Sequence, residues 1–287
     1  MSSSRAATIA GTKHDRREAI ERALAVGLEA AKLIMRVYAT PFTVDYKGKD
    51  DPVTRADREA NALIVAALSK DYPEIPIVAE ESDPKEFAGF TKSRAVWFVD
   101  PLDGTREFVA KNGEFSVMIG LAEDGRATAG VLVNPGERRC FVGVVGAGAF
   151  EVAESGGRTA IHVTSATTLE RARVVVSRSR KSQKLDAVLA ALPASARATP
   201  TGSSGVKAAR VAVGEAEIYL QPGMAGKRWD ACAPEAIVRA AGGMFTDVKG
   251  DPFDYATEDL ENRLGIVATS AGVYEATMTI VRSVVSS

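Results

Sequence analysis

The chain contains a pair of aspartates, Asp100 and Asp103, whose spacing suits metal chemistry. An apolar run over residues 95–99 predicts a buried strand, and this strand ends in the sequence Asp-Pro-Leu-Asp-Gly-Thr. Pro101 fixes its own φ and Gly104 tolerates conformations that other residues avoid, so both carboxylates can lie on one side of a tight turn. Two carboxylates this close repel each other unless a cation lies between them, and Mg²⁺ prefers such oxygen ligands. The alternative is an ordinary turn, because Asp-Pro and Asp-Gly are also common turn dipeptides.

Three further acidic residues stand where predicted elements begin or end. Glu80 follows a strand expected over residues 75–79, and its alternative interpretation is a solvated strand end. Asp230 opens a predicted helix, where it is either an N-cap or a metal ligand. Asp57 lies three residues after Thr54, the expected N-cap of another helix. It is therefore either the partner in a capping box or a residue of the active site.

A second kind of site is expected at Gly202, Ser203 and Ser204, which precede a helix predicted over residues 206–213. Backbone N–H groups and hydroxyls at a helix start can hold a phosphate, and Lys207 adds a positive charge. The alternative is a serine that only caps its helix. Carboxylates that gather Mg²⁺ beside an anion site are the equipment of metal-assisted phosphate hydrolysis.

The composition excludes several other classes of protein. The chain is 46% hydrophobic and 25% charged with a net charge of −1, so neither a nucleic-acid partner nor a membrane surface is indicated. Two cysteines and two histidines are too few for a disulfide scaffold or a histidine-based zinc site, and they fit a reducing, cytoplasmic setting. No apolar run approaches the roughly 20 residues of a membrane-spanning helix.

The predicted elements favour an α+β fold rather than a simple alternation of strands and helices. A long amphipathic helix is expected over residues 15–38, and a β-meander over residues 115–152. Pro234 is expected in the first turn of the helix that Asp230 opens. A polar link at residues 154–158 divides the chain into an N-terminal subdomain, 1–157, with most metal ligands and a C-terminal subdomain, 158–287, that completes the active site and substrate pocket.

Three acidic motifs together resemble those of the lithium-sensitive, Mg²⁺-dependent inositol monophosphatase superfamily. They are Glu80-Glu81-Ser82, the stretch Asp100-Pro101-Leu102-Asp103-Gly104-Thr105, and Trp229-Asp230, and they stand in the same order with the right gaps. The stretch from Pro52 to Asp57 is similar to the N-terminal signature of that superfamily. The resemblance extends over about residues 15–271 and implies a layered α-β-α-β-α sandwich of the inositol monophosphatase and fructose bisphosphatase type.

The resemblance also implies a role for each matching residue. It implies two or three Mg²⁺ ions per active site, held by Glu80, Asp100, the Leu102 carbonyl, Asp103 and Asp230. It implies that Asp57, Thr105 and Glu80 act in catalysis, the first two by assisting the attacking water. It implies that the N–H groups of Gly104 and Thr105 hold the substrate phosphate. Further substrate contacts are expected from Gly202, Ser203, Ser204, Lys207 and Asp230.

Two stretches are similar to the 3′(2′),5′-bisphosphate nucleotidases of the CysQ type within this superfamily: Arg106-Glu107-Phe108 and the segment 112–117, Asn-Gly-Glu-Phe-Ser-Val. This branch has Lys more often than Arg at position 106, and Gly205 is an extra residue in a loop that usually reads Gly-Ser-Ser-Leu-Lys. The similarity implies a phosphorylated nucleotide as substrate, with Lys111, Lys207, Lys227 and Arg228 as candidate ligands of its second phosphate or as plain surface charges.

The resulting hypothesis is a Mg²⁺-dependent phosphatase that removes the 3′-phosphate of adenosine 3′,5′-bisphosphate and gives AMP, with its 5′-phosphosulfate analogue as a possible second substrate. Alternatives are an inositol or sugar phosphate phosphatase, a non-catalytic sensor of phosphorylated metabolites, and a structural protein whose acids are only caps and turns. Both a monomer and a homodimer are compatible with the sequence.

Overall fold

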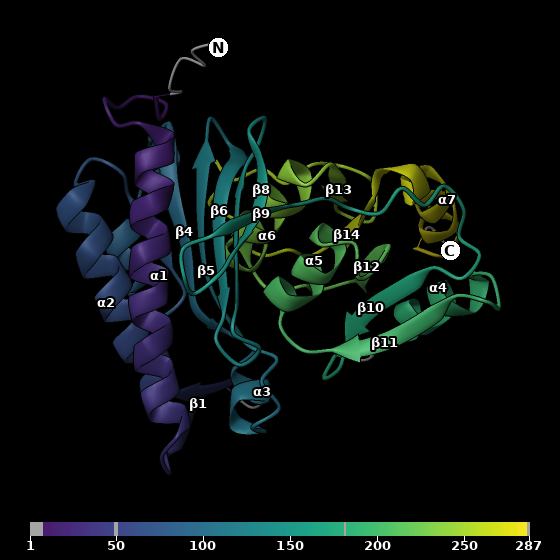
Figure 1. Ribbon diagram of the computed structural model, residues 1–287, viewed down its shortest axis with the longest axis horizontal. Helices are drawn as coiled ribbons and strands as arrows, with labels where there is room; N and C mark the ends of the chain where they lie inside the picture. The colour runs from purple at the N-terminus through teal and green to yellow at the C-terminus, as the bar shows by residue number, and fades with distance from the viewer. Residues whose placement is uncertain (1–7, 49–50, 181, 286–287) are drawn as a thin grey trace.

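Two β-sheets with a pair of helices between them form the centre of the molecule, and further helices cover the outer face of each sheet (Figure 1). The structure is a computed structural model that describes residues 8–48, 51–180 and 182–285. The layers follow the order α-β-α-β-α, which confirms the predicted fold class. Lys49 and Asp50, within the stretch expected to lead into the Pro52–Asp57 signature, lie outside the described residues.

The larger sheet has seven strands in the order β3-β4-β5-β6-β7-β8-β9. In this sheet β3 and β4 pair in parallel, and the remaining neighbours pair antiparallel. The meander predicted over residues 115–152 corresponds to β5 to β8. Its strands are β3 (Ile77–Ala79), β4 (Ala95–Asp103), β5 (Ser116–Glu123), β6 (Arg126–Asn134), β7 (Arg139–Val144), β8 (Gly148–Val152) and β9 (Arg158–Ile161). Because β9 pairs with β8, this sheet continues past residue 157, and the division into two subdomains there stays a prediction.

The smaller sheet has five strands in the order β11-β10-β12-β14-β13. Its strands are β10 (Arg173–Ser177), β11 (Arg197–Thr201), β12 (Ile218–Pro222), β13 (Gly243–Thr246) and β14 (Gly265–Ser270). A separate hairpin joins β1 (Val44–Gly48) to β2 (Asp51–Thr54). The strands β2, β9 and β11 are not among the elements that the sequence predicts.

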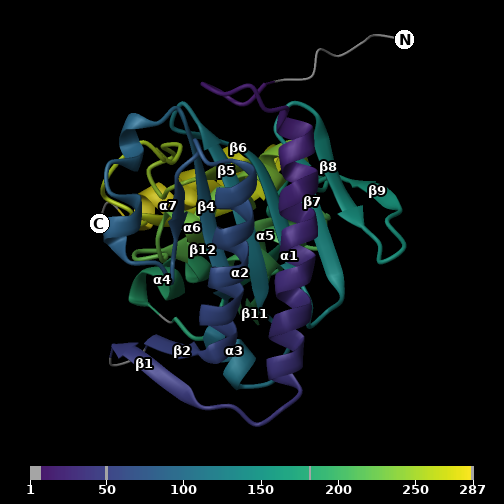
Figure 2. The ribbon, with the colours of Figure 1, turned by 90° about the vertical axis from the view of Figure 1, so that its left-hand side faces the viewer.

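Helices α1 (Arg16–Tyr38) and α2 (Arg55–Asp71) lie side by side over the outer face of the larger sheet (Figure 2). Between the sheets lie α5 (Ser204–Ala212) and α6 (Arg228–Ala240), and the far side of the smaller sheet carries α4 (Gln183–Ala191) and α7 (Tyr274–Val285). The short helix α3 (Thr105–Val109) follows β4 directly, and two 3₁₀ turns occupy Pro84–Phe87 and Phe90–Lys92.

The prediction that Pro234 lies in the first turn of its helix is wrong. Helix α6 begins at Arg228, so Pro234 lies in the second turn, inside the helix. A proline has no N–H, and the carbonyl of Asp230 therefore lacks its usual donor four residues on.

A row of glycines allows α6 to pack directly against the backbone of the larger sheet. Gly120, Gly130 and Gly143 are register partners on β5, β6 and β7. A Cβ atom on Gly120 or Gly130 would lie 2.6 Å from backbone atoms of Ala233, and one on Gly143 would lie 2.7 Å from the Cα of Ile237. No other residue type fits this row without moving the helix, and the row thereby sets the position of the N-terminus of α6, where Asp230 lies.

We expect Gly130→Ala to lower the free energy of unfolding by about 1–3 kcal/mol, because the added methyl group overlaps the backbone of α6. Urea unfolding followed by circular dichroism measures this change. Gly157→Ala is the matched control, since a Cβ there meets only the Ser155 hydroxyl at 3.6 Å. Equal stability of the two variants would show that α6 does not depend on the glycine row.

Candidate active site

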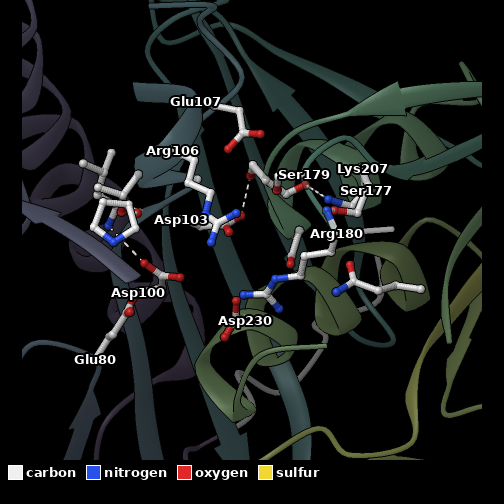
Figure 3. A pocket seen from close by; sticks show the side chains of 17 residues that line it. Glu80, Asp100, Asp103, Arg106, Glu107, Ser177, Ser179, Arg180, Lys207 and Asp230 are labelled. Carbon is white, nitrogen blue, oxygen red and sulfur yellow. Dashed lines mark hydrogen bonds between the residues drawn. The ribbon is translucent and has the colours of Figure 1, made fainter. Parts of the chain in front are cut away.

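A polar cleft opens where β3, β4 and the starts of α5 and α6 meet (Figure 3). Each of Asp100, Asp103 and Asp230 offers one carboxylate oxygen, and these three oxygens lie within 4.8 Å of one another. Glu80 lines the same cleft from the end of β3. The structure thus brings together the four acidic residues that the sequence analysis selected from distant parts of the chain.

The turn after β4 has the geometry expected of its sequence. Pairing between β4 and β5 stops at Asp100 and resumes at Asp103 opposite Ser116, so the strand bulges between the two aspartates. Asp100 Oδ1 accepts the N–H of Leu102 at 3.0 Å. Gly104 has a φ of 90°, and a Cβ there would lie 2.9 Å from the Glu114 carbonyl oxygen, so the turn requires glycine.

Burial and mutual repulsion make the carboxyl groups of Asp100 and Asp230 poor anions without a cation. Burial, followed by the charges of Glu80 and Asp103, raises the pKa of Asp100 well above its usual range. Burial, followed by the charges of Asp103 and Glu80, raises the pKa of Asp230 to about 7. A divalent cation among these oxygens removes the repulsion, and an all-oxygen donor set of this kind fits Mg²⁺.

Asp57 is both a helix cap and part of the site. Its Oδ2 accepts the backbone N–H of Thr54 at 2.7 Å and the Thr54 hydroxyl at 2.6 Å, which completes the predicted capping box. Its Oδ1 accepts the Thr105 hydroxyl at 2.9 Å. Burial raises the pKa of Asp57, although the hydrogen bonds from Thr54 and Thr105 oppose this shift. Asp57 and Thr105, which the resemblance expects to assist the same water, are therefore hydrogen-bonded to each other.

The Gly-Ser-Ser loop faces the site differently at each residue. Ser203 and Ser204 both line the cleft, and the Ser203 hydroxyl donates a hydrogen bond to Asp103 Oδ2. Gly202 N–H donates to Glu114 Oε2 at 2.7 Å, and a Cβ on Gly202 would lie 2.2 Å from the side chain of Glu107.

Lys207 lies fully buried behind this loop and also lines the cleft. Its Nζ donates to the Ser203 carbonyl oxygen at 2.6 Å. Burial lowers the pKa of Lys207 to about 8, while the charges of Asp103 and Glu107 act in the opposite direction. The ammonium group therefore offsets part of the negative charge of the site.

Lys47 contacts Glu80 and Glu81 from the β1–β2 hairpin. Its Nζ donates to Glu80 Oε1 at 2.9 Å and to Glu81 Oε1 at 2.6 Å. Burial lowers the pKa of Lys47, but the two glutamates outweigh it and the net shift is upward. Burial in turn raises the pKa of Glu80, with Lys47 opposing.

Several residues that line the cleft were not predicted from the sequence to act there. Arg180, in the loop after β10, points toward Asp230, and Arg106 lies beside Asp103 (Figure 3). The other missed lining residues are Pro52, Glu107, Ser177, Ser179 and Gln221. The only sequence signal for Arg180 is its place in the polar stretch Ser-Arg-Ser-Arg directly after a strand.

Three of the cations considered for a second phosphate are engaged elsewhere. Lys111 Nζ lies 4.0 Å above the ring of Tyr38. Lys227 Nζ lies 4.9 Å above the ring of Trp229, and Arg228 Nε donates to the Asp254 carbonyl oxygen at 2.9 Å. None of the three lines the cleft that holds the aspartates.

Comparison with known proteins finds relatives over nearly the whole chain. The profile of the inositol monophosphatase family matches residues 15–286. The 3′(2′),5′-bisphosphate nucleotidase CysQ of Salmonella typhimurium is 36% identical over 242 residues, which cover 84% of this chain and 95% of the relative.

Solved structures agree with this match. CysQ from Bacteroides thetaiotaomicron superposes with a TM-score of 0.75 and 28% identity, covering 89% of this chain and 98% of that one. The suppressor protein SuhB from Bartonella henselae superposes with a TM-score of 0.79 and 24% identity, covering 92% and 98%, and supports the fold. Within the described residues, no helix is both long and apolar enough to cross a membrane.

We expect the metal-free protein to lose stability as pH rises from about 5 to 7. A carboxyl group whose pKa is raised on folding contributes stability that is present below its unfolded value and is lost as pH rises through its folded value, about 7 for Asp230. The slope for one such group is at most about 1.4 kcal/mol per pH unit. Asp230→Asn removes this titration and should flatten the profile, and saturating Mg²⁺ should restore stability at pH 7 to 8 in the unsubstituted protein.

Urea unfolding at pH 5, 6, 7 and 8, with EDTA or with Mg²⁺, measures both effects. Asp45→Asn serves as the control, because that carboxylate is exposed and does not line the cleft. Identical pH slopes for Asp230→Asn and the unsubstituted protein would contradict the assignment of buried, mutually repelling acids.

Proposed function

Because the chain belongs to the inositol monophosphatase family, we propose that it is a Mg²⁺-dependent phosphomonoesterase that hydrolyses the 3′-phosphate of adenosine 3′,5′-bisphosphate to AMP and phosphate. The observation that carries the proposal is the convergence of Asp100, Asp103 and Asp230 beside the Asp57–Thr105 pair. Similarity to CysQ nucleotidases supports the choice of substrate.

Glu80, Asp100, the Leu102 carbonyl, Asp103 and Asp230 are the proposed Mg²⁺ ligands. When bound, the metal supplies charge neutralisation for the phosphate and acidifies water. The Thr105 hydroxyl donates to Asp57 Oδ1, and it also lies 3.2 Å from the Leu102 carbonyl oxygen. The Thr105–Asp57 pair is proposed to orient the attacking water. The N–H groups of Gly104 and Thr105 are proposed to hold the phosphate, because they open α3 at the floor of the cleft.

The proposed reaction is a direct in-line displacement. The water oxygen forms a bond to phosphorus, the bond from phosphorus to the ribose 3′-oxygen breaks, and the water proton leaves toward the Thr105–Asp57 pair. The leaving 3′-oxygen gains a proton from solvent. No side chain forms a bond to phosphorus in this scheme, which agrees with a site built of carboxylates and a hydroxyl whose hydrogen is committed to Asp57.

Arg180 is the proposed ligand of the second phosphate. A hollow lined by Arg180, Lys184, Gln221 and Met224 adjoins the aspartate cleft and shares Arg180 and Gln221 with it. Among the residues that the structure describes, none forms a hydrogen bond or ion pair with the Arg180 guanidinium. A guanidinium binds phosphate through two parallel hydrogen bonds, so this side chain suits the 5′-phosphate of the substrate.

The second candidate is hydrolysis of inositol or sugar phosphates, which the family match favours. A monophosphate such as inositol 1-phosphate needs the metal site but not a cation for a second phosphate. We also expect the enzyme to be cytoplasmic and to be inhibited by lithium. Its expected assembly is a monomer or a homodimer.

We expect phosphate release from adenosine 3′,5′-bisphosphate to exceed release from inositol 1-phosphate and fructose 1,6-bisphosphate by at least tenfold, to stop in EDTA and to fall with Li⁺. Asp103→Asn should keep the fold and lose at least about 10³ in kcat, because a ligand carboxylate is removed from the reacting centre. Preference for inositol phosphate would overturn the nucleotidase assignment, and normal turnover of Asp103→Asn at low Mg²⁺ would overturn the metal assignment.

Arg180→Gln should raise KM for the bisphosphate by roughly tenfold, because the variant loses one charge-assisted contact to the second phosphate. A tenfold change corresponds to about 1.4 kcal/mol. KM for adenosine 3′-monophosphate should stay unchanged, because that substrate lacks the second phosphate. Steady-state kinetics on both substrates separate the two effects, with Arg94→Gln on the exposed surface as control. An equal rise for both substrates would assign Arg180 to the scissile phosphate instead.

A further inference from the structure

Asp103 accepts a hydrogen bond from one buried hydroxyl group, which in turn contacts a second one. The proposed reaction uses neither hydroxyl. The Ser203 hydroxyl donates to Asp103 Oδ2, and the Ser116 hydroxyl oxygen lies 3.0 Å from that of Ser203. Ser116 is fully buried and Ser203 is 6% exposed. The backbone N–H of Gly205 also donates to Asp103 Oδ2, at 2.9 Å.

The direction of these hydrogen bonds follows from counting hydrogens. The Ser203 hydroxyl has one hydrogen, and an ionised carboxylate only accepts. Since Ser203 gives its hydrogen to Asp103 and accepts the N–H of Val206 at 3.1 Å, the remaining contact requires Ser116 to donate to Ser203. The result is a chain of hydrogen bonds that runs from Ser116 through Ser203 to Asp103.

Gly205, the extra residue in the Gly-Ser-Ser loop, makes room for this chain. A Cβ atom at position 205 would lie 2.5 Å from the Ser116 hydroxyl oxygen and 2.7 Å from the Leu132 and Met118 side chains. Helix α5 therefore approaches β5 closely enough for Ser116 and Ser203 to touch only because residue 205 is glycine.

The backbone of Ser203 is strained in the same place. Its φ is 55° and its ψ is 135°, a combination that a residue with a side chain rarely adopts. Such a conformation persists where the surroundings hold it, and here three hydrogen bonds to the hydroxyl do so.

We propose that the Ser116–Ser203 chain is the device that presents Asp103 to the metal with one fixed oxygen, and that it thereby sets the Mg²⁺ affinity of the site. Oδ2 is occupied by Ser203 and Gly205, so Oδ1 is left for the cation. Partners behind a metal ligand commonly account for 10- to 100-fold in metal affinity. Ser203 is then a positioning residue. The inference rests on the magnesium site of the proposed function.

Isothermal titration calorimetry with Mg²⁺ alone, on the full chain without substrate, tests the proposal. Ser203→Ala should weaken Mg²⁺ binding by at least tenfold, and Ser116→Ala by a smaller factor. The double variant should match Ser203→Ala, because Ser116 acts through Ser203 and the two losses are not additive. Activity should return when Mg²⁺ is raised to saturation.

Ser270→Ala is the matched control. Ser270 is also fully buried and shares a hydroxyl–hydroxyl contact of 2.9 Å with Thr164, but it lies away from Asp103. Ser270→Ala should lower the melting temperature about as much as Ser116→Ala does, and it should leave the Mg²⁺ affinity unchanged. Ser203→Gly separates loss of the hydroxyl from backbone strain, since glycine accepts the positive φ.

Each failure has its own signature. Unchanged Mg²⁺ affinity in Ser203→Ala and Ser203→Gly, or additive losses in the double variant, overturns the positioning role while the metal site stands. Absence of Mg²⁺ binding by the unsubstituted protein overturns the metal site and the proposed function with it. Should Ser203→Ala fail to fold, the comparison of Ser116→Ala with Ser270→Ala still decides the outcome.

Discussion

The structure depends on holding several buried carboxylates of like charge within a few ångströms of one another. Backbone N–H groups do much of this work: Leu102 donates to Asp100, Gly205 to Asp103 and Lys227 to Asp230. Each bond occupies one oxygen and leaves the second oxygen of that carboxylate available to a cation. Burial, and after it the repulsion that remains, raises the pKa of Asp100 and of Asp230. A divalent cation among the free oxygens would relieve that repulsion.

Bringing backbone donors this close to carboxylates requires positions without side chains. A Cβ on Gly226 would lie 2.4 Å from Asp230 Oδ2, and Gly104 permits the turn that follows Asp103. The glycines of β5, β6 and β7 meet the same requirement further away, because they allow α6 to lie on the sheet and thus place Asp230 opposite β4. The stability of the fold and the position of Asp230 therefore depend on the same feature, the close packing of α6 against the larger sheet.

The features predicted from the sequence are those encoded locally. The strand that ends in Asp100, the capping box of Thr54 and Asp57, and the meander all follow from short patterns, and the structure contains them. Strand β11 was not predicted, because Arg197–Thr201 is mostly exposed, contains a proline and lies at a sheet edge. Arg180 could not be predicted either, since only the folding of the chain brings a surface-like Ser-Arg-Ser-Arg loop to the aspartates.

Asp57, Ser203 and Asp230 each had two interpretations from the sequence, a helix cap or a functional residue. The two interpretations are compatible at each position. Asp57 and Asp230 are the third residues of α2 and α6, and Ser203 is the N-cap of α5, so each stands at the start of a helix. The N-termini of α5 and α6 line one cleft, and the N-terminus of α2 is joined to it by the Asp57–Thr105 hydrogen bond. The positive ends of helix dipoles favour carboxylates and phosphate. A capping residue that also faces the cleft stabilises its helix before any metal binds, and this double use explains how so much negative charge can be gathered in one folded chain.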